Sequence, residues 1–197
     1  MDTLVARCYE PLLGRVLRPL RAAVAGLCPP GPVLDCCCGA GGLAALLTGE
    51  GRTVTGVDND AAMLAMARRT APMAQFLHGD ARELPFAAGS FAAACVCLAL
   101  HAMPPVTAAA VLAQLRRVAR TVIVADYALA ERNLAVPAVG MAHGVEWLVG
   151  GEHYRWYGEY MRAGAIEGLL AREGLRPSAR VSVLGGAATV AACGGMA

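Results

Sequence analysis

The stretch PVLDCCCGAGGLAALL, residues 32–47, joins a short apolar run to a helix-forming run through a turn rich in cysteine and glycine. The apolar run ends at Asp35, and Gly39, Gly41 and Gly42 follow it. Glycine lets the backbone turn tightly and approach a ligand without a collision from a β-carbon. A helix that starts at such a turn directs the positive end of its dipole at the ligand. We therefore interpret the stretch as a strand, a ligand-binding turn and a helix.

Outward from this turn, strand-like apolar runs alternate with runs of helical periodicity. Further strands are predicted at 52–58, 74–80, 90–100, 121–127, 179–186 and 187–194, and further helices at 60–70, 105–120 and 158–175. Residues up to Pro30 are predicted to form one or two helices outside this alternation. Strands that are separated by helices and apolar on both faces are typical of a parallel sheet covered on both sides. The turn between the last two strands is too short for a crossover helix, so we expect an antiparallel hairpin there.

The composition describes one globular domain without a strong electrostatic preference for a partner. The chain has 197 residues, of which 57% are hydrophobic and 16% charged, so general disorder is excluded. The net charge of +2 favours neither nucleic acid nor an anionic membrane as a partner. Early charges in the N-terminus argue against a signal peptide, and glycine and proline interrupt the uncharged stretch 86–115. We therefore expect no transmembrane segment and a cytoplasmic location.

Eight cysteines without a signal peptide are typical of a reducing compartment. Cys36, Cys37 and Cys38 are adjacent, Cys95 and Cys97 alternate along a predicted strand, and no CxxC pair occurs. Structural zinc sites use thiolates in closely spaced pairs. We therefore interpret the cysteines as small hydrophobic residues that fill the turn and the pocket wall, with no metal bound, and keep a metal or redox role as the lesser alternative.

Carboxylates follow three successive predicted strands, at Asp35, Asp58 and Asp80. An acid at position 35 would repel the pyrophosphate of a dinucleotide by about 1–4 kcal/mol, and Cys37 breaks the G-x-G-x-x-G pattern of dinucleotide-binding turns. The three acids suit, in order, an α-amino group, ribose hydroxyls and an exocyclic adenine amine. Each acid alone is also a common helix cap or turn former. Together they predict S-adenosylmethionine as the ligand.

Four segments between residues 33 and 127 now define a family resemblance: VLDCCCGAG, VTGVDNDAAMLAMA, GDARELPFAAGSFAAACVCLALH and VIVADY. This part of the chain resembles the class I S-adenosylmethionine-dependent methyltransferases. It is similar to their type 11 group, which includes ubiquinone and menaquinone biosynthesis enzymes. The resemblance implies an α/β fold, a three-layer α/β/α Rossmann-like sandwich with a seven-stranded, mostly parallel sheet in the order 3-2-1-4-5-7-6 and an antiparallel C-terminal hairpin.

The resemblance also implies which residues line the cofactor site. The methionine part would be lined by Asp35, Cys37, Gly39 and Gly41. The ribose and adenine would be held by Asp58, Asn59, Asp80 and Ala81, with Cys97 and Leu98 passing beneath the cofactor. The chain departs from the family pattern at Cys37, where most members have glycine, and at Ser90-Phe91-Ala92, where Asp-Ser-Phe-Asp is usual. A small side chain at 37 should still fit, and the second departure affects local packing more than the cofactor.

A single domain over residues 1–197 is expected, with an N-terminal helical lid at 1–30, a cofactor-binding core at 31–127, and a substrate wall and hairpin at 128–197. The expected reaction moves a methyl group from S-adenosylmethionine to a small organic acceptor by in-line displacement and leaves S-adenosylhomocysteine. The resemblance leans toward an aromatic or quinone-like acceptor, and a homodimer stays open as the assembly state. The alternatives are a non-catalytic protein that binds S-adenosylmethionine or S-adenosylhomocysteine, and, less favoured by Asp35 and Cys37, a nicotinamide-dependent oxidoreductase.

His101 follows the fourth strand of the predicted core and is a candidate general base, although a histidine there can also bind the loop or the substrate. A cluster rich in aromatic residues, HGVEWLVGGEHYRWYGEY at 143–160, is placed between the fifth strand and the last helix. We expect it to form the substrate wall through His143, Glu146, His153, Trp156 and Tyr157, joined by Tyr9 from the N-terminal helix. A metal site of His143, Glu146 and His153 is the minor alternative, because the spacing matches no standard zinc motif.

Overall fold

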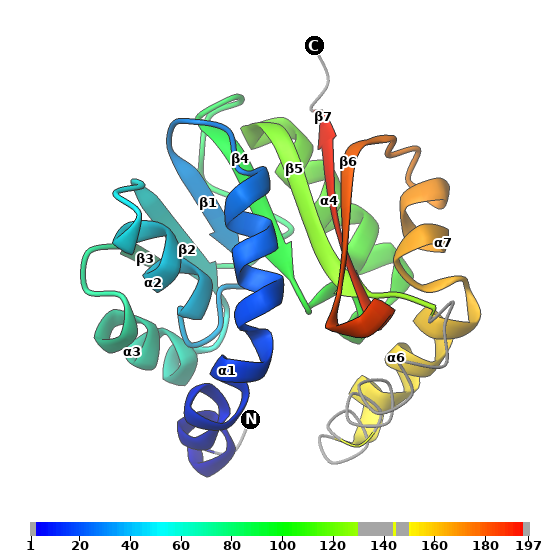
Figure 1. The fold of residues 1–197 in the computed structure, drawn as a ribbon, viewed down its shortest axis with the longest axis horizontal. Coiled ribbons are helices and arrows are strands. Elements are labelled where there is room, and N and C mark those ends of the chain that lie inside the picture. The colour runs from blue at the N-terminus through cyan, green and yellow to red at the C-terminus, as the bar shows by residue number, and fades with distance from the viewer. Residues whose placement is uncertain (1–2, 130–143, 145–149, 195–197) are drawn as a thin grey trace.

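A computed structural model describes residues 3–129, 144 and 150–194 of the chain, with the backbone alone described for 3–13. Strands in this part form one sheet in the order β3-β2-β1-β4-β5-β7-β6 (Figure 1). The strands are β1 Val33–Cys36, β2 Val54–Asp58, β3 Gln75–His78, β4 Phe91–Cys97, β5 Ala119–Tyr127, β6 Pro177–Val183 and β7 Ala188–Gly194. The first five pair in parallel, and β7 lies antiparallel between β5 and β6. The predicted fold class and strand order are confirmed.

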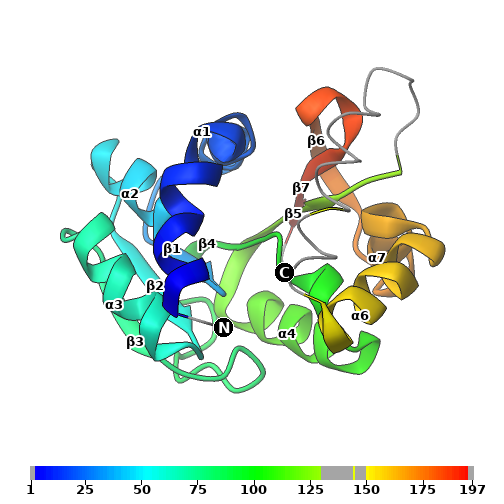
Figure 2. The same ribbon diagram turned by 90° about the horizontal axis from the view of Figure 1, so that it is seen from below.

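Helices cover both faces of this sheet (Figures 1 and 2). The helices are α1 Thr3–Leu27, α2 Gly42–Gly49, α3 Ala61–Thr70, α4 Pro105–Val118, α6 Gly151–Arg162 and α7 Ala165–Arg172, with short 3-10 turns η1 Leu100–Ala102 and η3 Leu184–Gly186. One buried cluster joins the sheet to α1 and α2, and another joins it to α4 and α7. In the described part of the chain, no helix has both the length and the hydropathy of a membrane span.

The central strand β4 shows why the sequence is apolar without alternation there. Its residues Ala93 and Cys95 pack toward α1 and α2, whereas Ala94 and Val96 pack toward α4 and α7. Successive side chains of a strand point to opposite faces, so a strand covered on both sides buries every residue. The Cys95 thiol lies 3.6 Å from the Sγ of Cys28 at the end of α1, so these cysteines fill the interface between helix and sheet.

Two expectations for the C-terminal half are wrong. The predicted single helix over 158–175 is two helices, because the chain breaks at Ala163 and Gly164, where Gly164 takes a φ of 96°. The break is tight, since a β-carbon at Gly168 would lie 1.9 Å from the Ala163 carbonyl oxygen. In addition, α6 already begins at Gly151, so the described part of the aromatic cluster lies on a helix and not in a loop before one.

The predicted ends of two elements also differ from the structure. The strand expected over 90–100 ends at Cys97, and the chain continues into η1. The helix expected over 105–120 ends at Val118, where β5 begins directly. Both differences place His101 in a short turn at the carboxyl end of β4, beside the carboxyl end of β5.

Candidate active site

The glycine turn between β1 and α2 is held by a carboxylate of the neighbouring strand. The Gly39 N–H donates to Asp58 Oδ2 at 2.8 Å, and the Asp60 N–H donates to Asp58 Oδ1 at 2.9 Å. Asp60 in turn caps α3, as its side chain accepts from the first turn of that helix. Gly41 has a φ of 80°, and a β-carbon on it would lie 3.0 Å from Ala67 of α3. Asp58 therefore fixes the turn against both β2 and α3.

Cys37 occupies a position of this turn that favours glycine, with a φ of 57°. Left-handed backbone costs a residue with a β-carbon about 1–2 kcal/mol, and β-branching makes it worse. We therefore predict that Cys37→Gly is at least as stable as the wild type and that Cys37→Val is less stable by about 1–2 kcal/mol. Urea unfolding followed by circular dichroism measures both, and a valine variant as stable as the wild type would contradict the strain.

Asp35, at the end of β1, is 2% exposed, and its Oδ2 has no hydrogen-bond partner within the described part of the chain. Burial raises its pKa from 3.8 to about 7, with Arg21 acting in the opposite direction and Asp58 adding to the increase. A hydrogen bond from the Ala44 backbone also lowers this pKa. An unpaired acceptor of this kind is costly when it is ionised, and a cationic group of a ligand would offset the cost.

The raised pKa of Asp35 has a consequence for stability. In the native state Asp35 keeps its proton at pH values where the unfolded chain has lost it. The contribution of Asp35 to the free energy of unfolding is therefore fully present below pH 3.8 and is lost as the pH rises through about 7. We predict that Asp35→Asn removes this loss, so that the variant gains up to about 4 kcal/mol on the wild type between pH 4 and pH 8. Thermal unfolding of the ligand-free proteins across that range measures the gain, and parallel pH curves would contradict it.

The third predicted acid has a different environment. Asp80 follows β3, its side chain is 42% exposed, and both of its carboxylate oxygens accept from the Arg82 guanidinium. Arg82 holds the pKa of Asp80 low, at about 2. Asp58 and Asp80 remain neighbours through the pairing of β2 with β3, where the Gly79 N–H donates to the Asp58 carbonyl. The structure thus brings Asp35 and Asp58 together at the glycine turn and leaves the Asp80 side chain exposed to solvent.

The carboxyl end of β4 connects the turn to a second group of polar residues. Burial raises the pKa of the Cys97 thiol well above its usual value, and the charges of Asp35 and Asp126 add to the increase. Cys97 is therefore a neutral thiol near enough to both acids to be influenced by their charges. Leu98 follows it with a φ of 49°, and its N–H donates to the Ala125 carbonyl of β5. This conformation turns the chain into η1.

His101 and Asp126 form a buried dyad, and each is 1% exposed. The His101 Nδ1 lies 2.6 Å from Asp126 Oδ1. Asp126 Oδ2 accepts from the backbone N–H groups of Leu100 and His101, and Oδ1 also accepts from the Tyr127 N–H. A carboxylate can only accept in each of these bonds, so the proton between His101 and Asp126 is donated by Nδ1.

Aromatic rings surround the His101 imidazole. Measured between ring centroids, the His101 ring lies 4.7 Å from Tyr127, 5.8 Å from His153, 5.9 Å from Tyr157 and 6.2 Å from Tyr160. The Tyr160 hydroxyl donates to the Tyr127 carbonyl at 3.1 Å, which ties α6 to β5. These residues combine apolar ring surface with polar tips, which suits a flat organic ligand.

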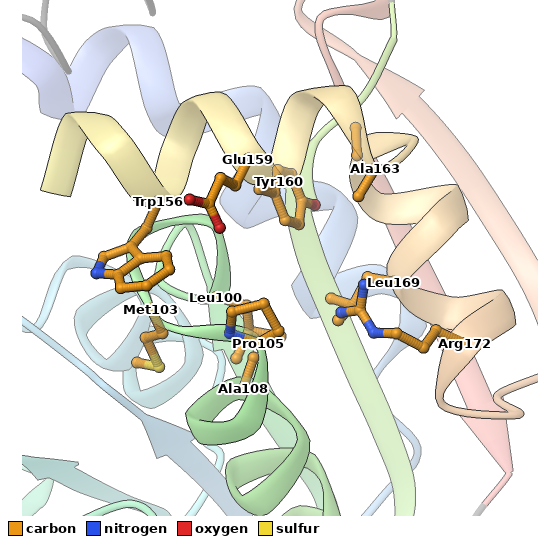
Figure 3. A pocket seen from close by; sticks show the side chains of 11 residues that line it. Leu100, Met103, Pro105, Ala108, Trp156, Glu159, Tyr160, Ala163, Leu169 and Arg172 are labelled. Carbon is orange, nitrogen blue, oxygen red and sulfur yellow. The ribbon is translucent and has the colours of Figure 1, made fainter. Parts of the chain in front are cut away.

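A pocket of about 130 Å³ lies between α6, α7 and the start of α4. Figure 3 shows Trp156 and Glu159 on α6 above Met103 and Pro105, with Arg172 reaching in from α7. Leu100, the neighbour of His101 in the chain, and Tyr160, whose ring contacts the His101 ring, both line this pocket. The structure thus brings His153 and Tyr157 to His101 and places Trp156 in the lining of the neighbouring pocket.

Other predicted substrate residues lie outside the described structure. His143 and Glu146 are not described, and of Tyr9 only the helical backbone is. Among the described residues, no cluster of His, Cys, Asp or Glu side chains has the arrangement of a metal site. Sequence reasoning missed Asp126, Tyr127 and Tyr160 as site residues, although an acid inside the apolar strand TVIVADY was a usable signal for Asp126.

Comparison with known proteins finds similarity to methyltransferases over about half of the chain. A methyltransferase-domain family model matches residues 33–121. An uncharacterised methyltransferase of Synechocystis sp. is 36% identical over 90 residues, which are 46% of this chain and 42% of that protein. The demethylmenaquinone methyltransferase of Beutenbergia cavernae is 34% identical over 108 residues, which are 55% of this chain and 44% of that protein. The matched region is thus less than half the length of either relative.

The fold has close counterparts among solved structures. Magnesium protoporphyrin IX methyltransferase from Synechocystis, solved with bound S-adenosylhomocysteine, superposes with a TM-score of 0.61 at 19% identity and covers 91% of this chain and 82% of that one. The sheet order, the glycine turn braced by Asp58 and the family match point to the same conclusion. Residues 33–121 are thus similar to methyltransferase domains, and the chain has the fold of the solved methyltransferases.

Proposed function

We propose that this protein transfers the methyl group of S-adenosylmethionine to a small organic acceptor, with His101 as the base that takes the proton of the acceptor. The observation that carries this proposal is the buried His101–Asp126 dyad, which lies at the carboxyl ends of β4 and β5 beside the glycine turn. A solvent-excluded imidazole with a fixed tautomer is what proton removal from a hydroxyl requires.

The residues of the turn fit the cofactor. Asp35 Oδ2 lacks a hydrogen-bond partner within the described part of the chain and would accept from the α-ammonium group. Each carboxylate oxygen of Asp58 accepts one backbone N–H, which leaves a second lone pair for ribose hydroxyls. The backbone at Gly39 and Gly41 leaves room for close approach. The sulfonium of the bound cofactor supplies the electrophilic methyl group.

The chain's own residues would then position and deprotonate the acceptor. Asp126 holds the His101 ring with Nδ1 protonated, so Nε2 can accept the proton of an acceptor hydroxyl. Tyr127, Tyr157 and His153 would hold a flat acceptor against this nitrogen and exclude water. Orientation of this kind supplies several kcal/mol of the barrier to an in-line displacement.

The acceptor is proposed to be aromatic or quinone-like. The ring-lined surroundings of His101 support this choice, and so does the sequence similarity to a demethylmenaquinone methyltransferase. We also propose that residues 1–30 close the site as a lid, that residues 31–127 hold the cofactor and that 128–197 form the substrate wall. The eight cysteines support a cytoplasmic location for the enzyme.

The proposal is tested by incubating the protein with methyl-labelled S-adenosylmethionine and a set of catechols, naphthols and hydroquinones. We expect label in one class of hydroxylated aromatic product and an equal amount of S-adenosylhomocysteine, both detected by mass spectrometry. Transfer to none of these acceptors, by a protein that binds the cofactor, would contradict the acceptor class proposed here.

A further inference from the structure

The guanidinium group of Arg21, in α1, lies directly over Gly42, the first residue of α2. A β-carbon built on Gly42 would lie 2.3 Å from Arg21 Cζ and 2.5 Å from both terminal nitrogens. The guanidinium therefore occupies space that is open only because residue 42 has no side chain. The residue before it, Gly41, caps α2 without a side chain, so the N-terminal end of this helix faces the same space.

Two side chains of the sheet show where this guanidinium reaches. The charge of Arg21 acts on Asp35 at the end of β1 and on Cys97 at the end of β4. Asp35 is almost completely buried, and its Oδ2 has no hydrogen-bond partner in the described structure. One small region thus holds a cation, a helix N-terminus and an unpaired carboxylate oxygen. These groups are complementary to the two charges of a free α-amino acid.

We propose that Arg21 binds the α-carboxylate of the bound adenosyl amino acid and thereby couples α1 to the occupied cofactor site, an inference that rests on the cofactor assignment above. The ammonium group would go to Asp35, and the carboxylate would lie between Arg21 and the start of α2. Without a cation there, the ligand carboxylate would face the negative Asp35 at short range, which is unfavourable. The planar guanidinium also suits two parallel hydrogen bonds to a carboxylate.

This role differs from a structural one, in which Arg21 only packs α1 against the start of α2. The two are separated by ligands with and without the amino-acid end, namely S-adenosylhomocysteine and 5′-methylthioadenosine. If Arg21 binds the carboxylate, Arg21→Met should weaken S-adenosylhomocysteine by about 10–100-fold and change 5′-methylthioadenosine by less than about twofold. Arg21→Lys should recover part of the loss because it restores the charge without the planar geometry.

Isothermal titration calorimetry with both ligands measures these changes. Arg18→Met is the matched control, because Arg18 is an exposed arginine on the same helix, and it should leave both affinities unchanged. Equal loss of both ligands in Arg21→Met, or no loss of either, would overturn the proposal. The proposal is also overturned if the ratio of the affinities for S-adenosylhomocysteine and 5′-methylthioadenosine is the same in the wild type and in Arg21→Met. A wild type that binds neither ligand refutes the cofactor assignment itself.

Gly42 offers a second, independent test. Gly42→Ala would meet only the far end of the flexible Arg21 side chain, so the fold should survive while the guanidinium is displaced. We expect Gly42→Ala to weaken S-adenosylhomocysteine in the wild type by about 5–50-fold and by less than about twofold in the Arg21→Met background. The same loss in both backgrounds would overturn the claim that position 42 acts through Arg21.

Discussion

Replacing His101 with glutamine is expected to lower kcat for methyl transfer to a hydroxylated acceptor by about 100-fold or more. Glutamine nearly preserves the volume and can still donate to Asp126, but it cannot take a proton from the acceptor. The affinity for S-adenosylhomocysteine should stay within about twofold of wild type, because the imidazole is held by Asp126 and by aromatic rings, whereas Asp58 holds the glycine turn. Steady-state kinetics and calorimetry measure the two quantities.

Asp126→Asn separates base chemistry from substrate binding. An amide in this position can donate to Nδ1 and favour the wrong tautomer of His101, so kcat should fall by about 10–100-fold and the acidic limb of the pH–rate profile should shift. A role in packing alone would leave the pH profile of a folded variant unchanged. Full turnover in His101→Gln would remove the proposed base, and an unshifted pH profile in Asp126→Asn would remove the positioning role.

The second large effect is expected at Asp58. Removing its side chain in Asp58→Ala leaves the N–H groups of Gly39 and Asp60 without their acceptor and also removes the predicted partner of the ribose. We expect the binding of S-adenosylhomocysteine to weaken by about 1–3 kcal/mol, which corresponds to a rise in Kd of roughly 5–150-fold. Calorimetric titration of a variant with an unchanged circular dichroism spectrum measures this loss.

The other acids provide the comparison. Asp80 is exposed and paired with Arg82, so Asp80→Ala should weaken S-adenosylhomocysteine by less than Asp58→Ala does. Glu50, an exposed acid at the end of α2, is the control and should have no effect when replaced with alanine. Equal losses for Asp58 and Asp80, or an unchanged affinity in Asp58→Ala, would contradict the placement of the ribose.

The sheet was predictable because the apolar runs of the sequence indicate which strands are buried. The run FAAACVC in β4 is apolar throughout because other elements cover both of its faces. The short turn between the strands predicted at 179–186 and 187–194 leaves no room for a crossover helix, so these strands pair antiparallel. The acids at strand ends were predictable for the same reason, since parallel strands bring their carboxyl ends to one edge. Asp35 and Asp58 lie close enough there for the charge of Asp58 to raise the pKa of Asp35.

The remaining site residues depend on contacts between distant parts of the chain. Asp126 pairs with His101 from 25 residues away, and Tyr160 reaches Tyr127 from 33 residues away. No local pattern reports such pairs. The break between α6 and α7 involves the close packing of Gly168 on Ala163, which the helical periodicity of the sequence does not reveal. Arg21 was one basic residue among several along α1 until its position over Gly42 distinguished it.

The central claim is that the turn, with Asp35 and Asp58, binds a positively charged amino-acid nucleoside and not a phosphorylated dinucleotide. Titrating the wild-type protein with S-adenosylhomocysteine and with NAD in one calorimetric series tests it most directly. We expect saturable binding of S-adenosylhomocysteine and no measurable heat of binding for NAD. Binding of NAD alone would contradict it.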